Sequence, residues 1–356
     1  MQLKKLLGIG LVVLAITSLL FGCQTKKTKN GDYITVTDML GETLEVKKNP
    51  RKVACVSRTT YDLLVAFGLG DRIDGAFAPI YDNPWTEIIY RKAKNEYRYA
   101  YNESPETFIT RGVDLVFAPE KYVTDNLKKH GVKALNISLY GNPTFDKYVY
   151  FFADLVKQIW DTEDVKIKVD EWKAKVNKAF LDVTNELSKH EISQKKIMYV
   201  RGDRNKGIGY TDIKSSFTEY AFRTLGFDFG GTYFGTNKPS QETIMKYNPD
   251  IFVIGGIYQN KLVELLKNDK TYNTLEAVKT SKIYTIPVGL TMFEQLSAMT
   301  PIFIYDMANK IYKEYFKYDI KEMVKETLKV YFGQELTDEQ VSYMLLGKDA
   351  NGKDLA

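Results

Sequence analysis

The chain has 356 residues, of which 44% are hydrophobic and 27% are charged, and its formal net charge is +5. Charges of both signs are interspersed, so the sequence has neither a basic block for nucleic acid nor an acidic tail for storing cations. The length exceeds the ~250–300 residues at which a single hydrophobic core stops growing, so we expect two lobes.

The N-terminal residues predict a secretory signal peptide. Two lysines precede an apolar run, residues 6–21, which ends at Gly22 and Cys23. This run is shorter than the ~20 residues of a stable membrane span, and no later segment is comparably apolar. We therefore expect residues 1–22 to be a signal peptide, and the remaining chain not to be an integral membrane protein.

Cys23 is the expected lipid attachment site. The sequence from Leu20 to Cys23 resembles a bacterial lipobox, in which a small residue precedes a cysteine that is lipidated and becomes the mature N-terminus. The polar residues 23–32 then form a flexible tether. We expect a lipid-anchored protein on the extracellular face of a Gram-positive cell membrane. Cys55 lies in an apolar run and has no partner, so no disulfide is expected.

Short strand and helix patterns alternate on both sides of one long helical pattern. This arrangement predicts an α/β fold with two Rossmann-like lobes, each with a mainly parallel sheet, over residues 33–160 and 191–356. The strands expected in the first lobe are 52–56, 75–78, 114–118 and 133–137. The strands expected in the second lobe are 196–200, 228–230, 250–254 and 282–286.

Residues 161–190 are expected to join the lobes. Between Asp164 and Lys189 the apolar residues recur at steps of three and four, and the segment has no glycine or proline. This pattern predicts one helix of about 25 residues, which at 1.5 Å per residue is long enough to bridge two domains. A stiff link of this kind limits hinge motion.

A repeated unit indicates that the two lobes are similar. The pattern of residues 104–118 recurs at 240–254, an offset of 136 residues. Each copy has a serine N-cap, an acid in the first helical turn (Glu106 or Glu242), a short helix and a second acid that opens a buried strand. Two copies of one unit predict two lobes of the same design.

Four segments carry a family resemblance. Residues 34–46 (ITVTDMLGETLEV) have the pattern of an opening hairpin, and residues 49–53 lead into a first strand. Residues 61–73 match a first helix with its exit, and residues 331–337 (YFGQELT) match a C-terminal segment. Together they resemble the helical-hinge periplasmic binding proteins, which serve ABC importers of siderophores, haem, cobalamin and some metal chelates. The resemblance covers the whole mature chain.

The resemblance implies a function and a set of partners. The protein would be a monomeric extracytoplasmic solute-binding lipoprotein that captures a ferric siderophore between its lobes and delivers it to a permease with its ATPase. Glu106 and Glu242 would form salt bridges with permease arginines, although each acid also stabilises its own helix by ~0.3–1 kcal/mol. Haem, cobalamin or a nickel chelate are alternative ligands, and a non-transporting surface sensor or adhesin is an alternative of another class.

The ends of the predicted strands supply candidate ligand contacts. Ligands of open parallel sheets bind beyond the carboxyl ends of the strands. Guanidinium groups bind carboxylate, catecholate or hydroxamate oxygens through paired donors, and aromatic faces cover an apolar ligand rim, so we expect a bulky anionic chelate. The candidates are Arg58, Tyr81, Trp85, Tyr122, Tyr140, Arg201, Tyr210, Tyr233, Tyr258 and Phe293.

A bare transition-metal site and an active site are not expected. The two histidines, His130 and His190, each close a helical pattern, where an imidazole serves as a cap. The metal would then arrive already chelated, and no resident metal or cofactor is expected. The sequence has no Gly-rich phosphate loop and no nucleophile elbow, so we predict a binding protein and not an enzyme.

Overall fold

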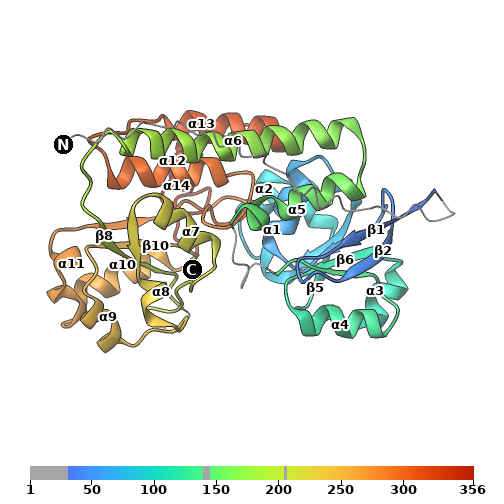
Figure 1. The fold of residues 1–356 in the computed structure, drawn as a ribbon, viewed down its shortest axis with the longest axis horizontal. Helices are drawn as coiled ribbons and strands as arrows, with labels where there is room; N and C mark the ends of the chain where they lie inside the picture. Colours follow the sequence, from blue (N-terminus) through green and yellow to red (C-terminus); the bar gives the residue numbers. More distant parts are fainter. Residues whose placement is uncertain (1–30, 139–144, 204–206) are drawn as a thin grey trace, which may run out of the picture.

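The computed structural model describes residues 31–138, 145–203 and 207–356. They form two α/β halves that are spanned along one side by a long helix (Figure 1). The predicted fold class, two mainly parallel sheets with flanking helices and a single long connecting helix, is confirmed. Among the described helices, none combines the length and the apolarity that crossing a bilayer requires.

The first half contains a five-stranded parallel sheet in the order β5-β4-β3-β6-β7. An antiparallel hairpin of β1 and β2 precedes it. β5 was not predicted, because three residues at the edge of a sheet carry no periodic pattern. The strands are β1 (Tyr33–Thr37), β2 (Thr43–Lys47), β3 (Val53–Cys55), β4 (Ile73–Phe77), β5 (Tyr97–Tyr99), β6 (Leu115–Ala118) and β7 (Ala134–Asn136).

The second half contains a four-stranded parallel sheet in the order β11-β10-β8-β9. All four strands lie where the apolar runs predicted them. β8 and β10 are central and almost wholly buried, which is typical of parallel strands covered by helices on both faces. The strands are β8 (Lys195–Val200), β9 (Phe227–Phe229), β10 (Ile251–Ile254) and β11 (Ile283–Thr285).

The two sheets share one order of connection. In the first, the chain adds β4 and β5 on one side of β3 and then crosses to add β6 and β7 on the other side. In the second, it adds β9 on one side of β8 and then β10 and β11 on the other. This change of side creates a topological switch point at the carboxyl end of β3 in the first sheet and of β8 in the second. Open α/β sheets bind their ligands at such switch points.

Helix α6 (Glu163–Leu187) is the 25-residue helix that links the halves. Its buried residues recur at helical spacing, from Val165 through Trp172 to Leu187, and the helix packs against α12 (Thr300–Ile311) and the helix of residues 145–159. Figure 1 shows α6, α12 and α13 along one side of both sheets. The other helices are α1 (Arg58–Ala66), α2 (Trp85–Ile89), α3 (Pro105–Arg111), α4 (Lys121–Lys129), α5 (Phe145–Ile159), α7 (Phe217–Thr224), α8 (Gly230–Phe234), α9 (Gln241–Tyr247), α10 (Gln259–Asn268), α11 (Glu276–Lys279), α13 (Ile320–Thr327) and α14 (Asp338–Leu345).

The loop between β11 and α12, residues 286–299, contacts both halves, and we call it the bridging loop. Asn83, which precedes α2, donates from Nδ2 to the carbonyl of Gly289 at 2.7 Å. The backbone amide of Ala298 donates to the buried carboxyl of Asp62 in α1 at 2.8 Å. Each of these buried hydrogen bonds contributes about 1 kcal/mol and costs more to leave unmade. The bridging loop therefore fixes the position of one half against the other.

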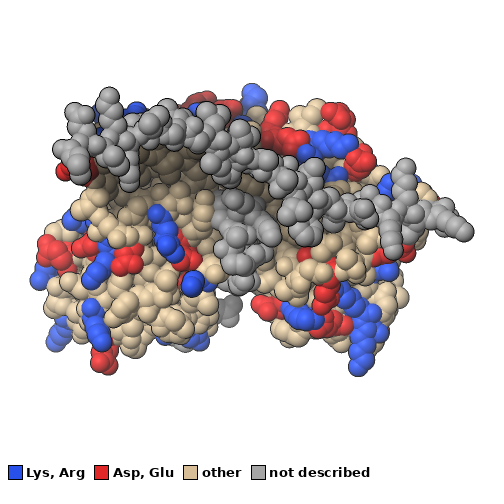
Figure 2. All heavy atoms as spheres, in the orientation of Figure 1, with Lys and Arg blue, Asp and Glu red and all other residues tan. Residues whose placement is uncertain are grey.

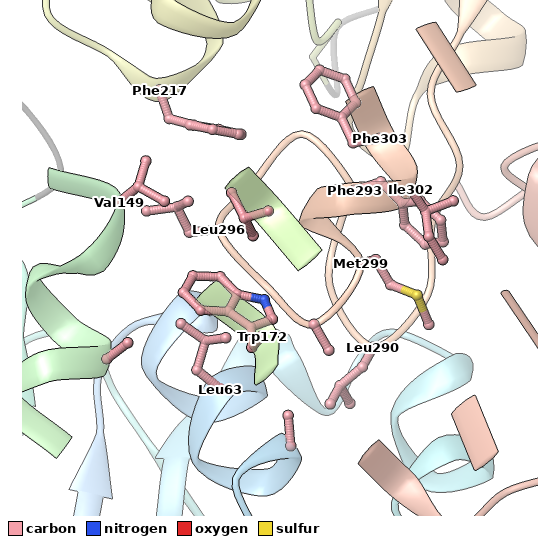
Figure 3. Close-up of a cluster of buried hydrophobic side chains, with 14 of the residues drawn as sticks. Leu63, Val149, Trp172, Phe217, Leu290, Phe293, Leu296, Met299, Ile302 and Phe303 are labelled. Atoms are coloured by element: carbon pink, nitrogen blue, oxygen red, sulfur yellow. The ribbon is translucent and has the colours of Figure 1, made fainter. Parts of the chain in front are cut away.

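The largest apolar cluster is continuous across the two halves. In Figure 3, Leu63 of α1, Trp172 of α6 and Phe217 of α7 surround Leu296 of the bridging loop. Trp172 also donates from Nε1 to the carbonyl of Ser297 at 2.9 Å, as a buried indole requires. Each sheet also has a smaller apolar cluster on its other face, away from the shared core. The halves therefore share one core and are not joined by α6 alone.

Candidate ligand-binding site

A cavity of about 430 Å³ lies between the two halves, at the carboxyl ends of both sheets. Residues of the first half form one wall, and residues of the second half and the bridging loop form the other. The lining residues are Val56, Ser57, Arg58, Thr59, Phe77, Tyr101, Pro119, Glu120, Tyr199, Arg201, Asp212, Phe217, Glu294, Gln295 and Leu296. The cavity thus contains the two switch points and both of the arginines that the sequence nominated.

Arg58 begins α1, and only Val56 and Ser57 separate it from the end of the central strand β3. Its Nη2 donates to the carbonyl of Pro79 at 2.9 Å, and no carboxylate of the described residues lies within 4.0 Å of it. Burial lowers the pKa of Arg58, and the more distant Asp82 opposes that shift. A guanidinium group stays charged in proteins, so this side chain brings a largely uncompensated positive charge to the cavity.

Arg201 occupies the equivalent position in the second half, directly after β8, but it has a carboxylate partner. Its Nη2 lies 2.9 Å from Oδ1 of Asp212, whose side chain is 10% exposed. The other oxygen of Asp212 accepts a hydrogen bond from the Thr218 hydroxyl. Much of the Arg201 charge is therefore neutralised inside the protein.

Glu294 projects from the bridging loop into the same wall. Oε1 accepts hydrogen bonds from the hydroxyl of Tyr199 at 3.0 Å and from the amide of Gly256 at 2.9 Å. Oε2 is buried and has no hydrogen-bond partner among the described residues, and the same holds for the hydroxyl of Thr59. Burial raises the pKa of Glu294, while nearby Arg201 acts in the opposite direction. Each half therefore contributes to the cavity lining a residue with a buried, unsatisfied polar atom.

Aromatic side chains form the apolar part of the wall. Phe77 and Tyr101 meet edge to face with ring centroids 5.6 Å apart, and Phe217 lies on the opposite side of the cavity. Such faces cover the apolar parts of a guest while the polar groups orient it. The arrangement suits a partly apolar ligand that carries anionic oxygens.

The face of the molecule seen in Figure 2 carries no patch of a single charge. Basic and acidic side chains are interspersed there over both halves. On this face, no broad surface field adds to the charge selection that the cavity groups can make.

Three of the predicted contacts belong to the core. Trp85 and Phe293 are fully buried, and Trp85 donates from Nε1 to the carbonyl of Lys348 at 2.7 Å. Tyr81 is nearly buried, and its hydroxyl donates to Oε2 of Glu96 at 2.9 Å. We expected these three side chains at the cavity, but they do not line it. Segments from the end of the chain fold over α2, and the bridging loop turns Phe293 inward.

The other predicted tyrosines that the structure describes also lie away from the cavity lining. Tyr122 is 57% exposed and Tyr233 is 55% exposed. Tyr210 follows Arg201 in a loop and is partly exposed, and Tyr258 precedes α10. Tyr140 and the expected lipidation site Cys23 fall outside the described residues. The expectation that aromatic residues at every strand end share one site is therefore too broad.

Several cavity residues were not predicted. Thr59 adjoins Arg58 in the first turn of α1, so the strand-end rule could have included it. Tyr101 follows β5, which was not predicted as a strand. Asp212 and Glu294 lie beside the nominated Tyr210 and Phe293, but the strand-end rule gave no reason to choose these carboxylates over their aromatic neighbours. Their place depends on tertiary contacts, chiefly those of the bridging loop.

The two first-turn acids occupy matching places in the two halves. Ser104 caps α3 through the amide of Thr107, and Ser240 caps α9 through the amide of Thr243. Glu106 and Glu242 follow these caps and are exposed, and neither forms an ion pair within the described part of the chain. Bonds from its own backbone amide and from Ser104 lower the pKa of Glu106. In Figure 1, α3 and α9 lie on the side of their sheets away from α6.

No group of three or more histidine, cysteine, aspartate or glutamate side chains within the described ranges is arranged to hold a metal ion. His130 ends α4, and its ring nitrogen Nδ1 lies 2.8 Å from the carbonyl oxygen of Asn126. His190 stacks on Tyr315 with ring centroids 3.8 Å apart. Both imidazoles are thus engaged near helix ends and not in the cavity.

Comparisons with known proteins agree with this architecture. Residues 114–288 match the family model described as periplasmic binding protein. The uncharacterized ABC transporter substrate-binding lipoprotein YvrC of Bacillus subtilis is 22% identical over 333 residues, which cover 88% of this chain and all of that protein.

Two solved structures have the same fold. Helicobacter pylori CeuE in its Ni-His complex has a TM-score of 0.70 at 18% identity, covering 86% of this chain and 97% of that one. A protein of an ABC-type Fe3+-hydroxamate transport system from Saccharomonospora viridis has a TM-score of 0.62 at 17% identity, covering 78% and 98%. Residues 114–288 are thus similar to the periplasmic binding protein family, and the whole chain has the fold of these solute-binding proteins of ABC transporters.

Proposed function

We propose that this protein captures a ferric siderophore in the cavity between its halves and delivers it to the permease of an ABC importer. The observation that carries the proposal is Arg58, a half-buried guanidinium without a carboxylate partner in the described residues, at the switch point of a sheet. A partly desolvated charge of this kind is stabilised by an opposite charge. A ferric chelate with carboxylate, catecholate or hydroxamate oxygens supplies that charge.

The composition of the cavity wall favours a chelate over a bare metal ion. Hard or borderline metal ions need several carboxylate, imidazole or thiolate ligands together. The carboxylates of this wall, Glu120, Asp212 and Glu294, form no such group in the described part of the chain, and guanidinium and aromatic groups stand beside them. The Fe3+-hydroxamate name of one structural neighbour supports an iron chelate. The Ni-His complex of another neighbour supports a nickel chelate as the alternative, and haem or cobalamin would use the same aromatic wall.

Glu106 and Glu242 are proposed to dock on arginines of the permease. Their support is their exposure, their matching places in the two repeated units and their lack of an ion-pair partner in the described residues. A carboxylate held at a capped helix end is available for bidentate pairing with arginine. The permease would work with its ATPase, and the binding protein would dock as a monomer.

The N-terminal segment is proposed to anchor the protein. Cys23 would carry the lipid and residues 23–32 would tether the folded halves, 33–160 and 191–356 with the linking segment 161–190, to the outer face of the membrane. The lipoprotein name of the Bacillus subtilis relative supports this arrangement. One lipid chain gives weak attachment and two give stable attachment, so the form of the lipid would decide how long the protein stays on the membrane.

Ligand binding to the soluble form that starts after Cys23 tests the proposal. Tryptophan fluorescence would be titrated with ferric hydroxamates, ferric catecholates, ferric citrate, haem, cobalamin and a nickel chelate. We expect a ferric chelate to bind with submicromolar affinity and Arg58→Ala to weaken it, while Arg91→Ala, a change at an exposed arginine outside the cavity lining, leaves it unchanged. The absence of any binding below the micromolar range would refute this ligand class.

A non-transporting sensor or adhesin would keep the cavity but need no docking acids. Cells whose chromosomal copy carries both Glu106→Ala and Glu242→Ala distinguish the two roles. A transport role predicts that uptake of the bound chelate stops while purified protein binds it with unchanged affinity. Unchanged uptake in the double variant would favour the sensor or adhesin.

A further inference from the structure

Glu294 lines the cavity between the halves, and one of its carboxyl oxygens is unsatisfied. The residue is 3% exposed and lies on the bridging loop. Oε1 accepts from Tyr199 and from the amide of Gly256, whereas Oε2 has no partner in the described part of the chain. A buried polar atom that lacks a partner costs about 1–3 kcal/mol, and more when it is charged. Because Glu294 lines the cavity, a small rotation of its buried carboxyl group brings Oε2 to a bound ligand, which removes this cost.

The hydrogen-bond pattern fits the acid form of Glu294. In a protonated carboxyl group, one oxygen acts as a carbonyl and accepts, and the other carries the proton and donates. Oε1 already accepts two hydrogen bonds, so the proton belongs on Oε2, which then needs an acceptor. An ionised carboxylate would instead leave an anionic oxygen buried without a donor. The hydrogen-bond pattern therefore predicts a ligand that places an oxygen acceptor at Oε2 and not an amine donor.

The charges that surround Glu294 lead to the same conclusion. On the second half, Arg201 pairs with Asp212 at 2.9 Å, and Tyr199 is a neutral donor. Across the cavity stands the charge of Arg58, and Glu120 at the rim is exposed, so solvent screens it. If Arg58 holds an anionic guest, an ionised Glu294 in the same cavity repels that guest. Proton uptake by Glu294 removes the repulsion and supplies a donor.

We propose that Glu294 is a specificity-determining contact which, in its acid form, donates a hydrogen bond from Oε2 to an oxygen of the chelate. The inference rests on the proposed function and narrows the ligand class to chelates that present an acceptor oxygen beside the Arg58-bound group. It also predicts that capture takes up a proton whenever Glu294 is ionised in the free protein. Binding and protonation then reinforce each other by linkage.

Three variants and one calorimetric measurement test the proposal. The probes are a ferric trihydroxamate and ferric citrate, titrated into the lipid-free protein from pH 5 to pH 8.5 in buffers of different ionisation enthalpy. Wild type is expected to take up as much as one proton per ligand, and its affinity should fall by as much as tenfold per pH unit at the upper end. Any titration of the probe itself appears equally in every variant, so only differences from wild type are scored.

Glu294→Gln keeps the shape and a donor but does not titrate. We expect it to bind within about threefold of wild type at pH 5 and to lose the wild-type proton uptake at high pH, so that it binds more tightly than wild type at pH 8.5. Glu294→Ala should weaken binding by about tenfold or more at pH 5, where wild type already carries the proton, and its affinity should not fall as the pH rises. Glu87→Gln, a change at an exposed acid outside the cavity lining, is the control and should keep the wild-type pH profile. Thermal unfolding of each variant establishes that it is folded.

The outcomes separate this inference from the proposed function. If no probe and no other chelate binds to wild type, both fail together. If a chelate binds but Glu294→Gln follows the wild-type pH profile, the binding function stands and the role of Glu294 is refuted. If affinity rises with pH and Glu294→Gln abolishes binding, Glu294 acts as a carboxylate for a cationic group, which also overturns the proposal.

Discussion

Arg58 and Arg201 occupy equivalent places in the two halves, yet their surroundings differ. Each follows the central strand of its sheet, at the switch point of the connections. Arg58 is held by the carbonyl of Pro79, a neutral acceptor, whereas Arg201 is paired with Asp212. Equivalent position thus brings both cations to one cavity, but only the local partner decides how much charge is left for a ligand.

The largest expected effect concerns the matched acids Glu106 and Glu242. Reversing both charges, Glu106→Arg and Glu242→Arg, should abolish chelate uptake by cells, because like charges at a docking site cost several kcal/mol. Either single change should reduce uptake less. Chelate affinity of the purified protein serves as the control and should not change. Normal uptake by the double variant would show that the two units are alike for folding reasons only.

A second prediction tests the difference between the two arginines. Arg58→Ala should weaken chelate binding by about 2–3 kcal/mol, the range of a charge-assisted hydrogen bond, and Arg201→Ala by less. Asp212→Asn removes the negative charge that neutralises Arg201 and should therefore strengthen binding of an anionic chelate several-fold. Fluorescence titration measures all three. Equal losses from the two alanine variants, with no gain from Asp212→Asn, would contradict the view that Asp212 masks Arg201.

A third prediction concerns Glu96, a half-buried carboxyl group of the first half. Burial raises the pKa of Glu96 to about 7, from 4.5. A folded-state pKa above the unfolded one means that the acid form is favoured by folding, so its contribution is present below pH 4.5 and is lost as pH rises toward 7. Glu96→Gln should therefore lose less free energy of unfolding than wild type between pH 5 and pH 8, as measured by urea denaturation.

The control for this prediction is Glu87→Gln, a change at an exposed acid on the same half. It should keep the wild-type dependence of stability on pH. Glu96 does not line the cavity, so Glu96→Gln should also leave the pH profile of ligand binding unchanged. A change in that profile would mean that Glu294 is not the titrating group that matters for capture.

The smallest expected effects come from the two helix caps. Ser104→Ala and Ser240→Ala should each lower the free energy of unfolding by about 1 kcal/mol, because each removes the acceptor for one N-terminal amide. Thermal or chemical unfolding measures the loss, and Ser→Thr at either position should restore most of it. An effect at only one serine would show that the repeated units differ in local stability.

The fold was largely predictable because its strongest elements carry local patterns. Central parallel strands are buried on both faces, so β3, β6, β8 and β10 appear as short apolar runs. α6 was predictable from the spacing of its apolar residues, which are now seen to be buried. β5 was not predictable, since a three-residue edge strand is defined by its neighbour and not by its own sequence.

The site was less predictable because half of it depends on distant contacts. The strand-end rule nominated Arg58 and Arg201, and both line the cavity. The same rule nominated Trp85 and Phe293, which are core residues because later segments of the chain cover them. Glu294 reaches the cavity only because the bridging loop crosses between the halves. The nearby sequence has no pattern that predicts the course of this loop.

The bridging loop has a further consequence for the thermodynamics of capture. Separating the halves would break the buried bonds from Asn83 to Gly289, from Ala298 to Asp62 and from Trp172 to Ser297. Each such loss costs ~1–3 kcal/mol, so wide opening is rare at equilibrium. The cavity is thus preorganised. Its walls are in place before a ligand binds, so little of the binding free energy is spent on ordering them. Discharging a tightly held guest then requires work supplied from outside the protein.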